Sequence, residues 1–206
     1  LWTALVSLGG ALLSIWLDLG HLLRIWKVYF QPHFGSVMTQ MVWGYTLFGV
    51  LLVLALREAI RNPEGKLLRT LLIAGLPLSL FIAGAVGALL GVNASRLSWH
   101  EGLLPVQFPV LALASGGAAM LAVLGLLGPA GDPCLPRQLR ILSIAVVSLV
   151  LAKLYFVWAD YSQALYGHVP QSVAAVKAVL GGQYWWAFWI VQIGLGTVVP
   201  VVVLSR

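Results

Sequence analysis

Two pairs of acidic and basic side chains lie in or beside segments that are otherwise apolar. Asp18 and His21 end the first such segment, in the stretch Leu-Asp-Leu-Gly-His. Lys153 and Asp160 lie seven positions apart in the fifth, which on a helix places them on one face about two turns apart. A charge in hydrocarbon costs several kcal/mol, so such groups normally face a bundle interior or a watery cavity and mark an ion or substrate path.

The chemistry that these groups suit is the exchange of two electrons and two protons with a quinone. A quinone head group needs hydrogen-bond donors and acceptors at its two oxygens, aromatic or apolar walls, and a route for protons. An imidazole and a buried carboxylate can accept the protons that a quinol releases. The candidate proton-handling residues are therefore Asp18, His21, Lys153 and Asp160.

Other apolar segments bring further polar side chains to the same membrane face. Four separate segments contribute such groups, and a convergence of four is not expected from chance. We expect these side chains to help bind the head group; they are Arg24, Gln40, His100, Gln107 and Tyr155.

Each acid–base pair also has an interpretation that involves no chemistry. Lys153 could extend toward the interface, or pair with Asp160, only to permit insertion. Asp18 could begin a solvated loop after a helix that Gly20 ends.

The elements that must position these residues are membrane-spanning helices. Of the 206 residues, 61% are hydrophobic and 9% charged, and the mean hydropathy is +0.97. About 20 apolar residues cross the bilayer core, which predicts five complete spans, and residues 1–19 make a sixth that we interpret as truncated. The runs are continuous rather than alternating, which favours helices over a β-barrel. The five predicted spans are 37–56, 67–92, 103–128, 139–160 and 184–204.

The fold class is therefore all-α, a polytopic transmembrane bundle of about six spans. We expect residues 1–206 to form a single transmembrane domain that is part of a larger subunit. Small residues that include Gly116 are expected to let the helices approach closely.

The composition also limits the cofactors and partners. The single cysteine, Cys134, allows neither an internal disulfide nor a cysteine-ligated cluster. All four histidines are expected near one face and none in the middle of a span, which argues against haem. We therefore expect any electron carrier to lie on a partner docked at that face. The net charge of +6 lies in loops and indicates membrane topology rather than nucleic-acid binding.

The distribution of charge predicts the orientation. Lys and Arg collect on the cytoplasmic side of short loops. The loops that follow the predicted spans 37–56 and 103–128, together with the end of the chain, carry seven Lys and Arg residues, against four on the opposite face. Residue 1 is therefore predicted to be cytoplasmic, and Asp18 and His21 to lie at the outer face. Eight of the nine Trp residues fall near that face, as a thick interfacial belt or as a surface for a flat ligand or a docked subunit.

Four stretches resemble the NrfD / polysulfide reductase membrane-subunit family. Residues 17–24 are similar to its Leu-Asp-Leu-Gly-Arg-Pro motif at a span end, although His21 and Leu22 stand where the family has Arg-Pro. Residues 31–38 resemble its following His-Pro-Asn-Phe-Ser-Ser-Pro-type loop, and residues 99–106 the loop before a later span. Residues 153–160 are similar to a family span that often has Arg where Lys153 stands.

The resemblance implies a subunit of eight to ten spans in the bacterial or archaeal cytoplasmic membrane. Such subunits carry no haem and no iron–sulfur cluster of their own, and they bind menaquinone or ubiquinone near the outer face. They exchange electrons with an iron–sulfur, ferredoxin-like subunit docked there, alongside further oxidoreductase or cytochrome subunits. The implied role is the membrane subunit of a respiratory oxidoreductase, in quinol oxidation or quinone reduction.

Three other functions stay open at this point. Asp18, Lys153 and Asp160 could instead form the relay of a proton-translocating subunit. A solute transporter would favour broken helices in repeat-related positions; Pro77 and Pro200 lie inside spans, but no convincing repeat accompanies them. A purely structural anchor is the remaining alternative.

Overall fold

The computed structural model describes residues 1–18, 26–92, 102–128 and 134–204, and every regular element in these ranges is a helix. The prediction of an all-α fold is confirmed. The elements are α1 (Trp2–Asp18), α2 (Trp26–Phe30), α3 (Val37–Arg61), α4 (Lys66–Gly91), α5 (Leu104–Leu127), α6 (Leu135–Tyr166), α7 (Pro170–Leu180), the π-helix η2 (Ala187–Val198) and α8 (Val199–Leu204).

Five stretches are long and apolar enough to cross a membrane, namely α3, α4, α5, α6 and η2 with α8, and α1 is a shorter apolar helix. The predicted spans are therefore confirmed, and the protein is a multi-pass integral membrane protein. The bounds differ at polar ends. The helix α6 starts before the predicted residue 139 and ends after 160, because helix formation needs no apolar side chains once a helix has begun. Its 32 residues span about 48 Å, more than the hydrocarbon thickness of about 30 Å.

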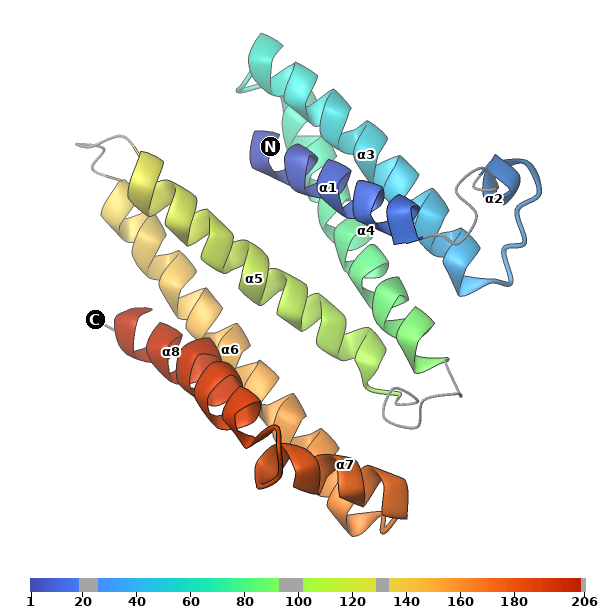
Figure 1. Ribbon diagram of the computed structural model, residues 1–206. Coiled ribbons are helices and arrows are strands. Elements are labelled where there is room, and N and C mark those ends of the chain that lie inside the picture. The colour runs from blue at the N-terminus through green and yellow to red at the C-terminus, as the bar shows by residue number, and fades with distance from the viewer. Residues whose placement is uncertain (19–25, 93–101, 129–133, 205–206) are drawn as a thin grey trace. The chain divides into compact units, whose positions relative to one another are not determined.

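The chain forms two compact units, residues 1–90 and 91–206. In the first unit α1 and α2 pack against α3 (Figure 1). The helices α3 and α4 approach at Gly44, where an added Cβ would lie 3.1 Å from Cγ1 of Ile82. The expectation of a single domain stays a prediction.

In the second unit α5 lies along α6, and α6 also contacts α7, η2 and α8 (Figure 1). The close approach of α5 and α6 occurs at Gly117, where a Cβ would lie 2.7 Å from Cγ2 of Val146. Val146 is 2% exposed. The predicted packing residue Gly116 has open space around it instead, because a shift of one position turns a residue by 100° around a helix.

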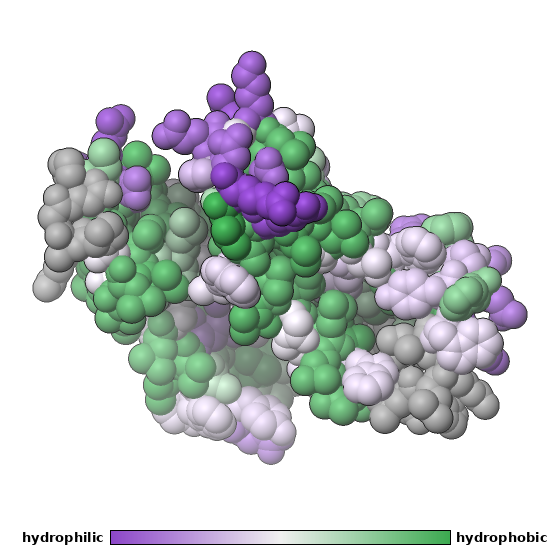
Figure 2. Space-filling model, turned by 90° about the horizontal axis from the view of Figure 1, so that it is seen from above, coloured by the Kyte–Doolittle hydropathy of each residue, from purple (hydrophilic) through white to green (hydrophobic). Residues whose placement is uncertain are grey.

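Large apolar side chains lie at the surface of both units. The face drawn in Figure 2 exposes many hydrophobic residues, and the hydrophilic ones gather in a few patches. Leu126 of α5 is 83% exposed and Ile60 of α3 is 70% exposed. Such surfaces are costly in water and favourable against lipid, which fits the membrane-spanning helices.

Candidate functional site

A hydrogen bond joins α5 to α6 through two of the predicted site residues. The side-chain amide of Gln107 donates from Nε2 to Oδ2 of Asp160 over 2.7 Å. The helix α5 starts at Leu104 with Pro105 in its first turn, where proline is well tolerated, so Gln107 lies one turn inside the helix. Gln107 is 8% exposed. The bond therefore lies at a helix–helix contact and not on the surface.

The second carboxyl oxygen of Asp160 has no such partner. Its Oδ1 atom is buried and makes no hydrogen bond. Leaving a buried polar atom unpaired costs about 1–3 kcal/mol, and more if the group is charged. A proton, a water molecule or a ligand group would remove that cost. Asp160 is thus prepared to accept a further partner.

Lys153 lines a small cavity between α5, α6 and η2, next to the hydrogen bond between Gln107 and Asp160. The cavity has a volume of about 130 Å³ and is lined by Gln107, Leu111, Lys153, Phe156, Val157 and Gln192. That is room for several water molecules, each of which occupies about 30 Å³ in the liquid. Lys153 and Asp160, both among the described residues, form no ion pair with each other. The interpretation that they pair only to permit insertion has no support in this geometry.

The helix η2 closes the cavity from the other side. Nζ of Lys153 lies 3.5 Å from the place that a Cβ on Gly196 would occupy, so glycine leaves room for the ammonium group. Thr197 donates from Oγ1 to the backbone carbonyl of Gln192 over 3.1 Å. Turns of π-helix occur frequently at functional sites.

Gln192 is the site residue that sequence reasoning missed. Its side chain lines the cavity beside Lys153. The available signal was one amide in an otherwise apolar final span. Which way it points depends on the π-helical register, which apolar periodicity does not encode.

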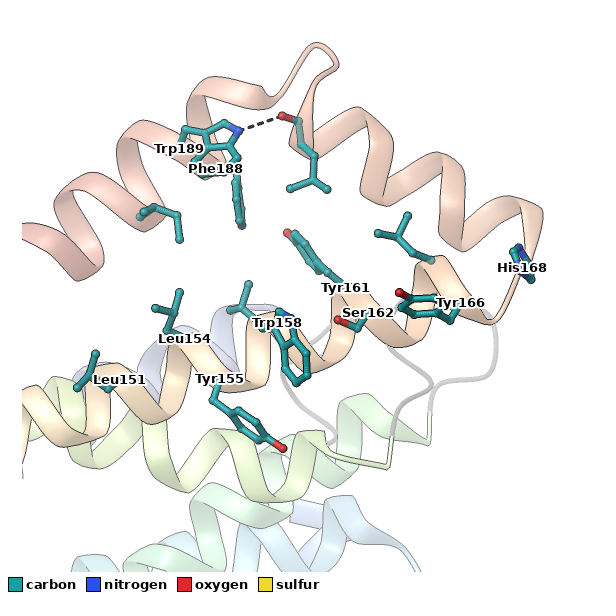
Figure 3. A pocket seen from close by; sticks show the side chains of 14 residues that line it. Leu151, Leu154, Tyr155, Trp158, Tyr161, Ser162, Tyr166, His168, Phe188 and Trp189 are labelled. Atoms are coloured by element: carbon teal, nitrogen blue, oxygen red, sulfur yellow. Dashed lines mark hydrogen bonds between the residues drawn. The ribbon is translucent and has the colours of Figure 1, made fainter.

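A larger groove lies beside the cavity, between α6, α7 and η2 (Figure 3). Its volume is about 1110 Å³. Tyr161 points from α6 toward Phe188 of η2, and the two ring centroids are 5.3 Å apart. The indole of Trp189 donates to the carbonyl of Leu180 over 3.0 Å and ties η2 to the end of α7. Val157 lines both the groove and the cavity.

The predicted site residues whose side chains the structure describes fall into three groups. Gln107, Lys153 and Asp160 come together around the cavity. Tyr155 lies on the groove side of α6 and is 61% exposed. Gln40 belongs to the first unit, where its amide donates to the carbonyl of Phe34 over 2.8 Å.

The remaining predicted residues have side chains outside the part of the chain that the structure describes. Asp18 is the last residue of α1, and only its backbone is described. The residues His21, Arg24 and His100 fall in stretches beyond the described ranges.

Comparisons with known proteins identify a family and two relatives. The family profile described as "Polysulphide reductase, NrfD" matches residues 1–205. A selenate reductase subunit of Mesobacillus selenatarsenatis is 28% identical over 249 residues, which cover 100% of this chain and 57% of that protein. Protein NrfD of Escherichia coli is 28% identical over 222 residues, which cover 96% of this chain and 69% of that protein. No solved structure matches.

The chain spans 57% of the length of the selenate reductase subunit. The family match nevertheless covers nearly every residue, including the five spans and the short apolar helix that precedes them. The chain therefore belongs to the polysulphide reductase NrfD family of membrane subunits.

Proposed function

We propose that the chain is the quinone-interacting membrane subunit of a multi-subunit reductase. The observation that carries the proposal is the Gln107–Asp160 hydrogen bond, with an unpaired Asp160 oxygen and the Lys153 cavity beside it. Polar groups inside a membrane bundle are costly and mark functional paths. The selenate reductase subunit and Protein NrfD, which this chain resembles, support a place in a reductase complex.

The reaction assigns different tasks to the chain and to its partner. Oxidation of a quinol breaks two O–H bonds and releases two protons and two electrons, and reduction of a quinone takes up the same set. The electrons pass to or from an iron–sulfur subunit docked at the outer face. The protons pass to or from side chains of this chain, for which Asp160 is suited by its free oxygen.

Asp18 and His21 are part of the same proposal. Asp18 ends α1, and His21 follows it three positions later. We assign them a role in quinone binding and proton transfer in the first unit. The site around Lys153 and Asp160 belongs to the second unit, so each assignment is tested by its own variants.

The test is quinol-dependent turnover by the complex purified through a tag on this subunit. We expect the purified complex to contain an iron–sulfur subunit and to oxidise decylubiquinol or menadiol. Asp18→Asn and His21→Ala are expected to lose turnover while the complex still assembles. Full turnover in both variants would overturn their assignment, and activity that is independent of any quinone would overturn the function itself.

Proton translocation is a second candidate, favoured by the cavity. Its volume of about 130 Å³ and its polar lining by Gln107, Lys153 and Gln192 would hold water next to Asp160. The complex in sealed vesicles would then move more protons per electron than quinol chemistry alone releases. A ratio equal to the chemical one would exclude this candidate and leave the quinone function intact.

A further inference from the structure

We propose that the groove between α6, α7 and η2 binds a prenylated quinone, with the ring between Val157 and Ser162 and the tail toward Leu151. This inference rests on the proposed function, and it adds a binding site that is built from the second unit alone. The groove is described by fourteen side chains of the second unit (Figure 3).

The size of the groove fits such an occupant. Sites for small molecules are about 300–1,000 Å³, and this groove has a volume of about 1110 Å³. The adjoining cavity of about 130 Å³ is too small for a ring and tail. The two spaces therefore suit different contents, a large ligand in the groove and water in the cavity.

The polarity of the groove changes along its length. Leu151, Leu154 and Ile193 line one end, whereas Ser162, Tyr166 and His168 line the other. Arg140 lies near the start of α6, and from it Leu151 is about 17 Å and Ser162 about 33 Å along the helix. The polar end thus falls at the interface and the apolar end within the hydrocarbon, as an amphiphile with a polar head and an apolar tail requires.

The polar groups of the groove fit a neutral head group. None of the fourteen described lining residues is Lys or Arg, so an anionic phospholipid head would find no cation there. The hydroxyl of Ser162 can instead bond an oxygen of a neutral ring. His168 adopts a left-handed backbone conformation with φ 52°, which is uncommon for residues other than glycine and marks positions worth examining for function.

The walls of the groove fit a flat ring. Tyr155, Trp158, Tyr161, Phe188 and Trp189 are all part of the lining. Phe188 is held between Tyr161 and Trp189, with ring centroids 5.3 Å and 5.0 Å away. Offset and edge-on contacts of this kind are the ones that aromatic rings prefer, and a bound ring extends the same arrangement.

Val157 connects the groove to the proton-handling residues. It lines the groove on one side and, on the other, the cavity that contains Lys153 and Gln107. A ring beside Val157 would lie one side chain away from that cavity. Protons released from it would then have a short path to Asp160 through water.

The test is photolabelling of the intact complex in membranes with an azido-ubiquinone that carries a decyl tail. Labelled peptides are identified by mass spectrometry, and quinol KM and kcat are measured in parallel. Leu154→Trp fills the groove, and Leu126→Trp, at a position 83% exposed on α5 and outside the groove lining, is the matched control. If Leu154→Trp fails to assemble, Leu165→Phe fills the groove from the next turns of α6.

We expect the label on peptides of α6 and η2. The groove-filling variant should lower that labelling at least tenfold and raise KM at least tenfold with little change in kcat, since it removes binding and not chemistry. The control should behave as the unmodified protein. Label confined to other helices, equal labelling of the filled groove, or a groove found covered by phospholipid or by a helix of another subunit would overturn the inference while quinol turnover upholds the function. Absence of both label and quinol turnover would overturn the two together.

Discussion

In the first unit the polar side chains of α3 bond backbone carbonyls and the hydroxyl of Tyr29, whereas in the second unit Gln107 of α5 bonds the carboxyl group of Asp160 in α6. Thr46 donates to the carbonyl of Val42, and Gln40 donates to that of Phe34. The cross-helix bond joins residues 53 positions apart. Of these bonds, only the one in the second unit involves a carboxyl group.

The difference separates polar groups that bond carbonyls and hydroxyls from a carboxyl group that keeps one oxygen unpaired. Among the residues that the structure describes, each unit contains one buried polar atom without a partner, Nε1 of Trp43 in the first and Oδ1 of Asp160 in the second. The indole nitrogen can only donate, and it keeps its proton. A carboxyl group can gain and lose one. Within the described ranges, only the second unit therefore combines an unpaired buried atom with a group able to exchange protons.

The largest expected effect comes from removing that group. Asp160→Asn keeps a hydrogen-bonding partner for Gln107 but cannot take up a proton. We predict that quinol turnover falls at least about 100-fold, the usual scale of a lost general acid or base. Steady-state turnover of the purified complex measures it, with co-purifying subunits as the control for assembly. Turnover within about twofold of normal would overturn the assignment of Asp160 as a proton-exchanging group.

The next largest effect is a loss of stability at the contact between α5 and α6. An added methyl at Gly117 meets Val146, which is 2% exposed and cannot move aside. Gly117→Ala should therefore destabilise the second unit by about 1–3 kcal/mol. Gly116→Ala is the matched control, because nothing lies within 4 Å of an added Cβ there. Denaturation of the two variants in mixed micelles compares them, and equal stability would refute the described packing of α5 on α6.

The cation in the cavity is expected to matter less than the carboxyl group. Lys153→Met keeps an unbranched side chain that is one heavy atom shorter, and it removes the charge beside Gln107 and Gln192. We predict a loss of about tenfold in turnover, which corresponds to about 1.4 kcal/mol in the barrier. A loss as large as that of Asp160→Asn would show that Lys153 is itself the main proton-exchanging group.

The smallest effect is predicted in the first unit. Gln40→Leu removes the bond to the carbonyl of Phe34, which is worth about 0.5–1.5 kcal/mol of stability. Turnover should stay unchanged, since this amide serves the start of α3. A loss of turnover with normal assembly would place Gln40 in the quinone site, as the sequence first indicated, and would remove the contrast between the units.

The helices and the polar residues could be predicted from the sequence because hydropathy reports them directly. Long apolar runs predicted α3 to α6, and the spacing of Lys153 and Asp160 predicted their common side of α6. Gln107 was also predicted to lie at the same membrane face as this pair, although its direct bond to Asp160 was not predicted.

The rest depends on helix register, which hydropathy does not report. A π-helix carries more residues per turn than an α-helix, so the face of Gln192 in η2 could not be read from apolar spacing. The close packing at Gly117 instead of Gly116 differs by one position. The short helices α2 and α7 are too brief for a periodic pattern to predict them.

The central claim is that Asp160 exchanges a proton when the quinone changes its redox state. Infrared difference spectra of the intact complex, recorded between the oxidised and reduced quinone, observe the C=O stretch of a protonated carboxyl group directly. The account predicts a carboxyl band that disappears in Asp160→Asn and persists in Asp18→Asn with reduced or unchanged intensity. A spectrum of Asp160→Asn identical to that of the unmodified protein would contradict it.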